Sequence, residues 1–276
     1  MRQNTPPRTE LPNVALSDGP LWQLEFGNSP LVAVAIHDGH STRKEVADLL
    51  AVGEAERLHE EDPYTGIWTS VAPTRIIGLR SRFEFDLNRP RQRAVYLKPD
   101  DAWGLQVWKT GPPSDVIRRS LFEYDAFYDH VRVTLQTLVS RFGHLAVFDL
   151  HSYNYRRQGI DAPVDSPKDN PEVNLGTGTM NRDRWASVVD RFIEEMRGFD
   201  FLGRGLDVRE NVKFTGGHFS RWIHETFPDS VCSLAIEVKK FFMDEWTGEA
   251  DQAALHGMGA ALRSAATGVL EELGRM

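Results

Sequence analysis

Three short apolar runs dominate the pattern of hydrophobic and polar positions along the chain. They cover residues 31–36, 145–150 and 231–238, and the first two end directly before a histidine. Apolar runs of this length without strict alternation are typical of strands buried on both faces, as in a parallel sheet. The sequence therefore predicts a sheet with these three runs as central strands.

Apolar residues recur at helical spacing between and after these runs. The predicted helices cover residues 42–59, 114–141, 182–197, 217–227 and 250–276. A fourth strand is expected over residues 75–87, because charged side chains at positions 80, 82, 84 and 86 alternate with apolar ones. Strands that alternate with helices predict an α/β fold of three layers, with helices on both faces of a mixed, largely parallel sheet.

Composition limits the classes of binding partner and the cell compartments that are expected. The 276-residue chain has a net charge of -8, so the clustered Lys and Arg that nucleic acids and anionic membranes bind are not expected. No apolar stretch approaches the ~20 residues of a membrane helix, and residues 1–20 lack the apolar core of a secretion signal. The single cysteine, Cys232, lies in an apolar run and is expected to be buried. We expect a cytosolic protein with an N-terminal arm over residues 1–20 and a single domain over residues 21–276.

Polar residues at the ends of the predicted strands are the candidates for chemistry. His37 and His151 follow the first two runs, and Glu237 lies near the end of the third. Ligands bind beyond the carboxyl ends of strands in open α/β sheets, so these side chains are expected to share a crevice. His218, at the start of the predicted helix 217–227, is a further candidate for contact with a substrate. The alternative for any single histidine is a structural role in packing.

A catalytic zinc ion usually has three protein ligands and one open position. The acidic run Glu60, Glu61 and Asp62 offers a third ligand, although a solvated helix end explains such a run equally well. No short motif pairs two histidines at metal-ligand spacing, so spacing alone does not identify a metal. Asp149 lies on the same strand face as His151, where a metal-bound histidine often finds a carboxylate partner.

Arginines gather in one region of this acidic chain. Arg80, Arg82 and Arg89 accompany Glu84 and Asp86 in the segment that follows residue 79. An arginine offers two parallel N–H groups to a carboxylate, so this group is a candidate clamp for a substrate carboxylate. The alternative is ion pairing at the surface with the two neighbouring acids.

These segments resemble the N-formylglutamate amidohydrolase family. The resemblance extends from about Val32 to Glu245 and rests on short motifs in a fixed order. The motifs are His37-Asp38-Gly39, Glu61-Asp62, Asp86-Leu87-Asn88-Arg89, Asp149-Leu150-His151-Ser152, Asn174-Leu175-Gly176, Gly216-Gly217, Ile236-Glu237 and Met243-Asp244-Glu245. The family is similar to zinc carboxypeptidases, which implies a phosphorylase/hydrolase-like (zinc-exopeptidase-like) α/β core.

The resemblance implies one Zn²⁺ per chain and a role for several of the motif residues. His37, Asp62 and His151 would be the zinc ligands, with Glu61 as the alternative to Asp62 because the two acids are adjacent. Glu237 would be the general base and then the general acid.

A substrate carboxylate would bind to Asn88 and Arg89, and we expect Arg82 and His218 to contact the substrate as well. The chain departs from the family pattern at Asp38, where serine is usual, and over residues 102–113, which have no counterpart in the motifs.

The sequence thus predicts an enzyme that hydrolyses the amide bond of an N-acyl (N-formyl) amino acid such as N-formylglutamate. A metal-activated water would attack the amide, and the partner would be a small molecule. The alternatives are a related N-acyl-amino-acid deacylase, a carboxypeptidase-like peptidase, or a non-catalytic protein that binds carboxylates. A serine hydrolase is disfavoured because the sequence has no GxSxG motif. The oligomeric state is not indicated.

Overall fold

The computed structural model describes residues 19–157, 159–161 and 163–276. Its strands are β1 (Trp22–Glu25), β2 (Leu31–Ala35), β3 (Thr74–Gly78), β4 (Leu145–Tyr153), β5 (Val173–Gly176), β6 (Val208–Glu210) and β7 (Val231–Lys239). Its helices are α1 (Lys44–Leu49), α2 (Glu54–Glu60), α3 (Thr65–Trp68), α4 (Ser114–Phe142), α5 (Ala186–Gly198), α6 (His218–Thr226) and α7 (Gln252–Leu273). Of the predicted arm over residues 1–20, only Gly19 and Pro20 fall within the described residues.

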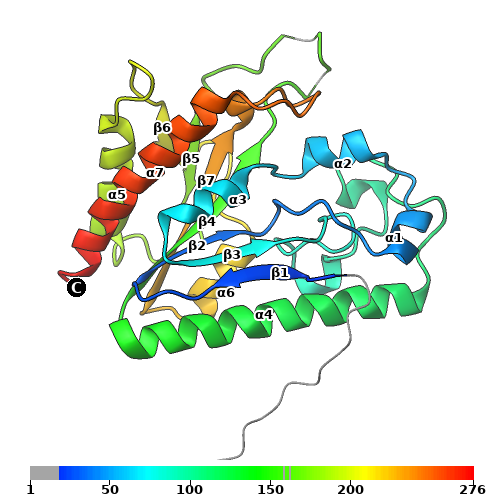
Figure 1. Ribbon diagram of the computed structural model, residues 1–276, viewed down its shortest axis with the longest axis horizontal. Helices are drawn as coiled ribbons and strands as arrows, with labels where there is room; N and C mark the ends of the chain where they lie inside the picture. The colour runs from blue at the N-terminus through cyan, green and yellow to red at the C-terminus, as the bar shows by residue number, and fades with distance from the viewer. Residues whose placement is uncertain (1–18, 158, 162) are drawn as a thin grey trace, which may run out of the picture.

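Seven strands of the described chain form one sheet in the order β1-β3-β2-β4-β7-β5-β6 (Figure 1). The four central strands, β3, β2, β4 and β7, are parallel to one another. β1 is antiparallel to its neighbour β3, and β5 is antiparallel to its neighbour β7. The three predicted apolar runs form β2, β4 and β7, which lie side by side in the middle of the sheet. The prediction of a mixed, largely parallel sheet is confirmed. A single domain over residues 21–276 stays a prediction.

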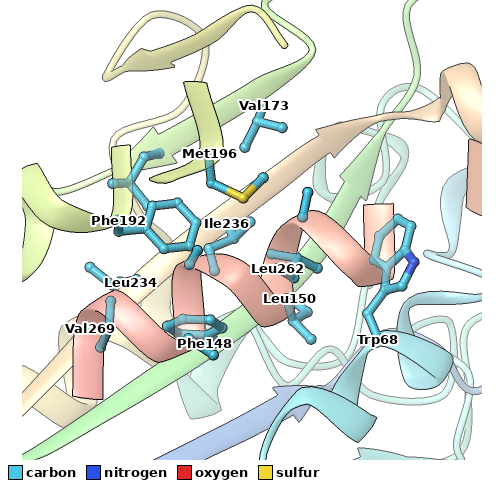
Figure 2. Packing of buried hydrophobic residues seen from close by; sticks show 14 of the residues in the cluster. Trp68, Phe148, Leu150, Val173, Phe192, Met196, Leu234, Ile236, Leu262 and Val269 are labelled. Atoms are coloured by element: carbon cyan, nitrogen blue, oxygen red, sulfur yellow. The ribbon is translucent and has the colours of Figure 1, made fainter. Parts of the chain in front are cut away.

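Helices α5 and α7 cover one face of the sheet (Figure 1). Phe148 and Leu150 of β4 and Leu234 and Ile236 of β7 point into this layer and are fully buried (Figure 2). Alternate residues of a strand face the same side, so each strand contributes every second side chain to this core. Phe192 of α5 meets Phe148 edge to face, with 5.4 Å between the ring centroids.

Helices α4 and α6 cover the opposite face. The other side chains of the central strands, such as Val34 and Val147, pack there against Phe127 of α4 and Phe219 of α6. Two apolar cores therefore lie on either side of one sheet, which confirms the three-layer α/β prediction. The two cores bury both faces of β2 and β4, and this explains why those strands lack polar alternation.

The single helix predicted over residues 42–59 is wrong, because the structure has two helices there. α1 ends at Leu49 and α2 begins at Glu54, after Gly53. Between them the Ala51 N–H donates to the carbonyl of Val107 (2.8 Å). This tertiary hydrogen bond replaces the helical one, so apolar spacing alone could not locate the break.

The strand predicted over residues 75–87 is also too long, because β3 ends at Gly78. Glu84 and Asp86 are fully buried, as are the neighbouring Phe83 and Phe85. The alternation of charged and apolar residues therefore does not distinguish a solvent-exposed face from a buried one. Buried ion pairs hold the charged members instead.

Three short strands, β1, β5 and β6, were not predicted. Each has four residues or fewer and lies at or next to an edge of the sheet. Cys232 in β7 is fully buried, as expected. Among the described residues no helix combines the length and apolar character needed to cross a membrane.

Candidate active site

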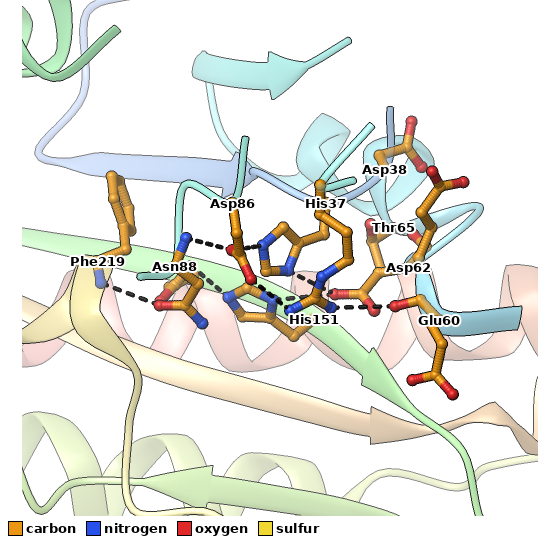
Figure 3. Close-up of polar contacts among 12 residues, drawn as sticks. His37, Asp38, Glu60, Asp62, Thr65, Asp86, Asn88, His151 and Phe219 are labelled. Atoms are coloured by element: carbon orange, nitrogen blue, oxygen red, sulfur yellow. Dashed lines mark hydrogen bonds and ion pairs between the residues drawn. The ribbon is translucent and has the colours of Figure 1, made fainter. Parts of the chain in front are cut away.

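Three side chains with metal-binding atoms meet at the carboxyl edge of the sheet (Figure 3). His37 follows the end of β2, and His151 lies near the end of the adjacent β4. Asp62 reaches them because its N–H donates to the carbonyl of His37 (3.0 Å). Its Oδ2 lies 3.0 Å from His151 Nδ1 and 3.4 Å from His37 Nδ1. All three side chains are buried.

This arrangement fits a small divalent cation. Tetrahedral zinc with bonds of about 2.0–2.2 Å separates its ligand atoms by roughly 3.3 Å, close to both separations from Asp62. His37 Nδ1 is buried and has no hydrogen-bond partner among the described residues. An unpaired buried nitrogen is costly, and a metal ion would satisfy it.

A second layer of carboxylates holds the outer nitrogens of both imidazoles. His37 Nε2 lies 2.7 Å from Asp86 Oδ1, and His151 Nε2 lies 2.9 Å from Asp149 Oδ1. Ser220 donates to the other oxygen of Asp149 (2.8 Å). Each histidine thus directs Nδ1 towards Asp62 while its Nε2 faces an acid, which is the usual support for a metal-bound histidine.

Burial and neighbouring polar groups shift the pKa values of the acids and of His151 in this site. Burial raises the pKa of Asp62, but a hydrogen bond from His151 and the nearby imidazole of His37 reverse this and hold it well below its usual range. Burial also raises the pKa of Asp86, and the nearby charges of Arg82 and His37 outweigh it, so this pKa is lowered too. Burial lowers the pKa of His151, but Asp149 raises it well above the ordinary value.

The structure separates the three acids of the run Glu60, Glu61 and Asp62 at the end of α2. Asp62 faces the two histidines, whereas Glu61 accepts hydrogen bonds from His40 and Ser81 on the other side of the chain. Glu60 makes a bidentate ion pair with Arg157 (3.1 and 3.0 Å). The geometry therefore favours Asp62 over Glu61 as the third ligand.

Glu237 lies beside His151, because β4 and β7 pair these two residues in register. Its side chain lines the same cavity as His37 and Asp62. Burial raises the pKa of Glu237 to about 7; the charges of Asp62 and Asp149 raise it further, whereas those of His151 and Arg82 lower it. A carboxyl group with a pKa near neutrality can both accept and donate a proton.

A cavity of about 430 Å³ opens above these residues, and Asn88 and Arg89 form part of its wall. The Phe219 N–H at the start of α6 donates to Asn88 Oδ1 (3.0 Å) and so fixes the amide. Gly217 packs so closely that a Cβ there would lie 2.2 Å from Asn88 Oδ1. This contact explains the need for glycine in the motif Gly216-Gly217.

Arg82 also lines the cavity, but its N–H groups are already used by the protein. They donate to Asp86 (2.9 Å), to the hydroxyl of Tyr96 (3.2 Å) and to the carbonyl of Glu60 (3.0 Å). Arg82 thus pairs with the acid that supports His37. The expected surface pairing of this arginine with Asp86 exists, but in the protein interior, where Asp86 is fully buried.

A further part of the wall is the segment that runs from Lys213 to Gly217. Asn174 of β5 holds it, since its Oδ1 accepts from the N–H groups of Val212 (3.0 Å) and Lys213 (2.8 Å), and its Nδ2 donates to the carbonyl of Phe214 (2.8 Å). The motif that contains Asn174 therefore fixes the backbone of the segment that lines the cavity.

Sequence reasoning missed several residues of the cavity wall. Trp103, Arg157, Lys213 and Lys240 all line it. Of these, only Trp103 had a signal, because it belongs to the segment without a counterpart in the family motifs. His218 is not among the lining residues; its ring lies 5.9 Å from that of Tyr128, so the geometry gives its predicted contact with substrate no support.

Comparisons with known proteins agree with this architecture. A solved N-formylglutamate amidohydrolase from Ralstonia eutropha JMP134 matches with a TM-score of 0.72 and 18% identity, over 92% of this chain and 98% of its own. A gene product of Agrobacterium tumefaciens matches with a TM-score of 0.68 and 15% identity, over 93% and 97%. A third structure, from Shewanella denitrificans OS-217, has a description that names carboxypeptidase A; it matches with a TM-score of 0.36 and 13% identity, over 92% and 65%.

At such low identities the first two structures show a shared fold. No curated protein matched the sequence. The model of one protein family, however, matches residues 29–243, which is well over half of the chain and includes His37, Asp62, His151 and Glu237. The chain therefore belongs to the N-formylglutamate amidohydrolase family.

Proposed function

We propose that this protein is a zinc-dependent amidohydrolase that cleaves the amide bond of an N-acyl amino acid, with N-formylglutamate as the first candidate substrate. The observation that carries the proposal is the buried cluster of His37, Asp62 and His151, with Glu237 on the adjacent strand. Membership of the family supports the hydrolase reaction and a small-molecule substrate. A cytosolic location belongs to the same proposal and rests on the sequence.

His37 Nδ1, His151 Nδ1 and Asp62 Oδ2 would hold the metal. Two imidazoles and one carboxylate are a common ligand set for catalytic zinc, although manganese, iron and cobalt accept the same donors. A bound metal ion would lower the pKa of a water molecule and polarise the carbonyl group of the amide.

Glu237 transfers the proton in this proposal. Its carboxylate accepts a proton as water attacks the amide carbon, and it then delivers this proton to the departing nitrogen. The shifted pKa of about 7 suits both steps at neutral pH. With N-formylglutamate the products would be formate and glutamate.

Asn88 and Arg89 would hold a carboxylate of the substrate. Arg89 has one loose ion pair, 3.7 Å from Nε to Asp86, and a third of its side chain is exposed. The fixed amide of Asn88 offers N–H groups beside it. Arg82 would act at a distance, by holding Asp86 behind His37.

Metal content and formate release test the proposal directly. The purified protein is expected to contain about one zinc ion per chain and to release formate from N-formylglutamate. Dialysis against a chelator should abolish turnover, and added Zn²⁺ should restore it. Full turnover by protein whose metal content has been shown to be zero would refute metal dependence.

Glu237→Gln tests the proton-transfer role. This variant should bind zinc as the wild type does and lose turnover by at least about 100-fold, since general acid–base groups contribute roughly 10²–10⁴. Glu249→Gln, an exposed change beyond the cavity wall, is the control. Turnover of other N-acyl amino acids or peptides in place of N-formylglutamate would favour the related deacylase or peptidase. Bound zinc without turnover on any of them would favour a carboxylate-binding protein.

A further inference from the structure

The cavity wall carries more positive charge than one substrate carboxylate requires. Among the described residues, its cationic side chains are Arg82, Arg89, Arg157, Lys213 and Lys240. Their existing partners decide which of them remain available to a ligand.

Three of the five are committed to the protein. Arg157 is neutralised by its bidentate pair with Glu60. The N–H groups of Arg82 donate to Asp86 and to two further oxygens. Lys240 is fully buried and donates to two backbone carbonyls at 2.6 and 2.7 Å. None of these three can turn towards a substrate without breaking contacts that hold the wall.

Lys213 differs from Arg82 and Arg157 because its charge is weakly compensated, and from Lys240 because its side chain is not fully buried. Its ammonium group donates to the neutral amide of Asn170 and lies 4.9 Å from the centre of the Tyr153 ring. The nearest carboxylate among the described residues, Asp165, is 4.0 Å away. Burial lowers the pKa of Lys213, as expected for a cation that lacks a close anion. An ammonium group has three N–H donors, so donors remain for a ligand.

Lys213 and Arg89 both line the cavity. Gly217 packs against Asn88, the neighbour of Arg89, and Lys213 begins the segment that ends at Gly217. Asn174 fixes the backbone of Lys213, and the amide oxygen of Asn170 accepts a hydrogen bond from its ammonium group. Two available cations that line one cavity suit a substrate with two carboxylates.

We propose that Lys213 binds the side-chain carboxylate of an acidic N-acyl amino acid, while Asn88 and Arg89 bind the other carboxylate. This inference rests on the proposed function and adds the residue that selects an acidic side chain. It makes Lys213 a specificity residue, since the amide that is cleaved lies at the metal ligands and Glu237.

The test compares N-formylglutamate with N-formylglutamine, which has nearly the same shape and no charge on its side chain. Lys213→Met should lower kcat/KM for N-formylglutamate by about 10- to 100-fold, mainly through KM, because a charge-assisted hydrogen bond is lost. The value for N-formylglutamine should change less than about twofold. Lys213→Arg should retain most of the preference for glutamate.

Lys239→Met is the matched control. Lys239 also contacts Asn170, through its carbonyl at 3.2 Å, but it is not part of the cavity wall. This variant should leave both substrates unaffected. If Lys213→Met lowers kcat/KM equally for both substrates, or for neither, Lys213 does not bind the side-chain carboxylate and the inference is overturned.

Binding of the free amino acids separates this inference from the proposed function. Calorimetry with the zinc-loaded protein should show L-glutamate binding at least about tenfold more tightly than L-glutamine, with the difference lost in Lys213→Met. If no N-formyl amino acid is hydrolysed but this difference is found, the proposed reaction fails and the acidic subsite stands. Equal binding of both amino acids to the wild type would overturn the subsite even where hydrolysis is observed.

Discussion

Asp149→Asn and Asp86→Asn separate two roles of the carboxylates behind the histidines. Both acids face the outer nitrogen of an imidazole, at 2.9 and 2.7 Å. Loss of such a partner typically weakens metal binding by about 10- to 100-fold, and we expect this effect in both variants. Their effects on folding stability should differ, because only Asp86 also neutralises arginine.

The difference in stability follows from the contacts of each acid. Asp149 is otherwise bonded to the hydroxyl of Ser220, which can rotate to suit an amide. Asp86 is fully buried and accepts from Arg82, whose side chain is only 11% exposed. Removing one member of a buried ion pair costs about 3–5 kcal/mol, and the slight exposure of Arg82 favours the lower end. Asp86→Asn should therefore cost about 3 kcal/mol. Asp149→Asn should cost less, because Asp62 still pairs with His151 after the change.

Thermal melting in the presence of a chelator measures this difference without a contribution from the metal. A loss of about 3 kcal/mol corresponds to roughly 6–12 °C in Tm for a protein of this size. Asp125→Asn is the control, because its pair with Arg91 is exposed and should be worth no more than about 1 kcal/mol. Zinc affinity is measured separately by competition with a coloured chelator. Equal losses of Tm in the Asp86 and Asp149 variants, or unchanged zinc affinity in both, would refute the reasoning.

Two further predictions concern the cavity wall and the pH dependence of folding. Gly217→Ala should raise KM for N-formylglutamate by displacing Asn88, since the new Cβ would lie 2.2 Å from Asn88 Oδ1. The control is Gly198→Ala, whose new Cβ would meet no atom within 4 Å and should leave the kinetics unchanged. Equal KM values in the two variants would contradict this prediction. Burial lowers the pKa of His224 to about 4, so this histidine stays neutral in the fold and is protonated below pH 6.5 only on unfolding. Its contribution to stability is complete above pH 6.5 and is lost as the pH falls towards 4; urea titrations should show about 2 kcal/mol less stability from this group at pH 5 than at pH 7. His224→Gln should lack that part of the pH dependence, and an unchanged pH dependence would exclude the assignment.

The sequence predicts the centre of this fold better than its edges. The runs that form β2, β4 and β7 are apolar because both faces of those strands are covered, and this pattern does not depend on distant residues. The break between α1 and α2 does depend on a distant residue, Val107, whose carbonyl binds the chain at Ala51. A window of neighbouring residues contains no trace of that contact.

The candidate site also contains residues that the sequence could locate and residues that it could not. His37, His151 and Glu237 could be located from sequence because each ends or nearly ends a buried strand. The role of Asp86 could not, because acids at alternate positions look the same whether water or an arginine faces them. Lys213 gave no signal, since its importance depends on which of the five cations around the cavity already have partners.

The charge balance of the site is the strongest argument that a metal belongs there. Among the described residues, the ion pairs of Asp62 and Asp149 are with the two histidines alone, and Glu237 has no ion pair. Among the described residues, the ion pairs of Arg82 and Arg89 are with Asp86 alone. Three buried or half-buried carboxylates without a lysine or arginine are costly, because burial removes the water that would stabilise their charge. Protons on His151 and Glu237 relieve part of this cost, since Asp149 outweighs burial and raises the pKa of His151, and burial raises the pKa of Glu237. A divalent cation between His37, Asp62 and His151 would supply two positive charges at the one point where all three side chains converge, so metal binding should stabilise the fold as well as enable the reaction.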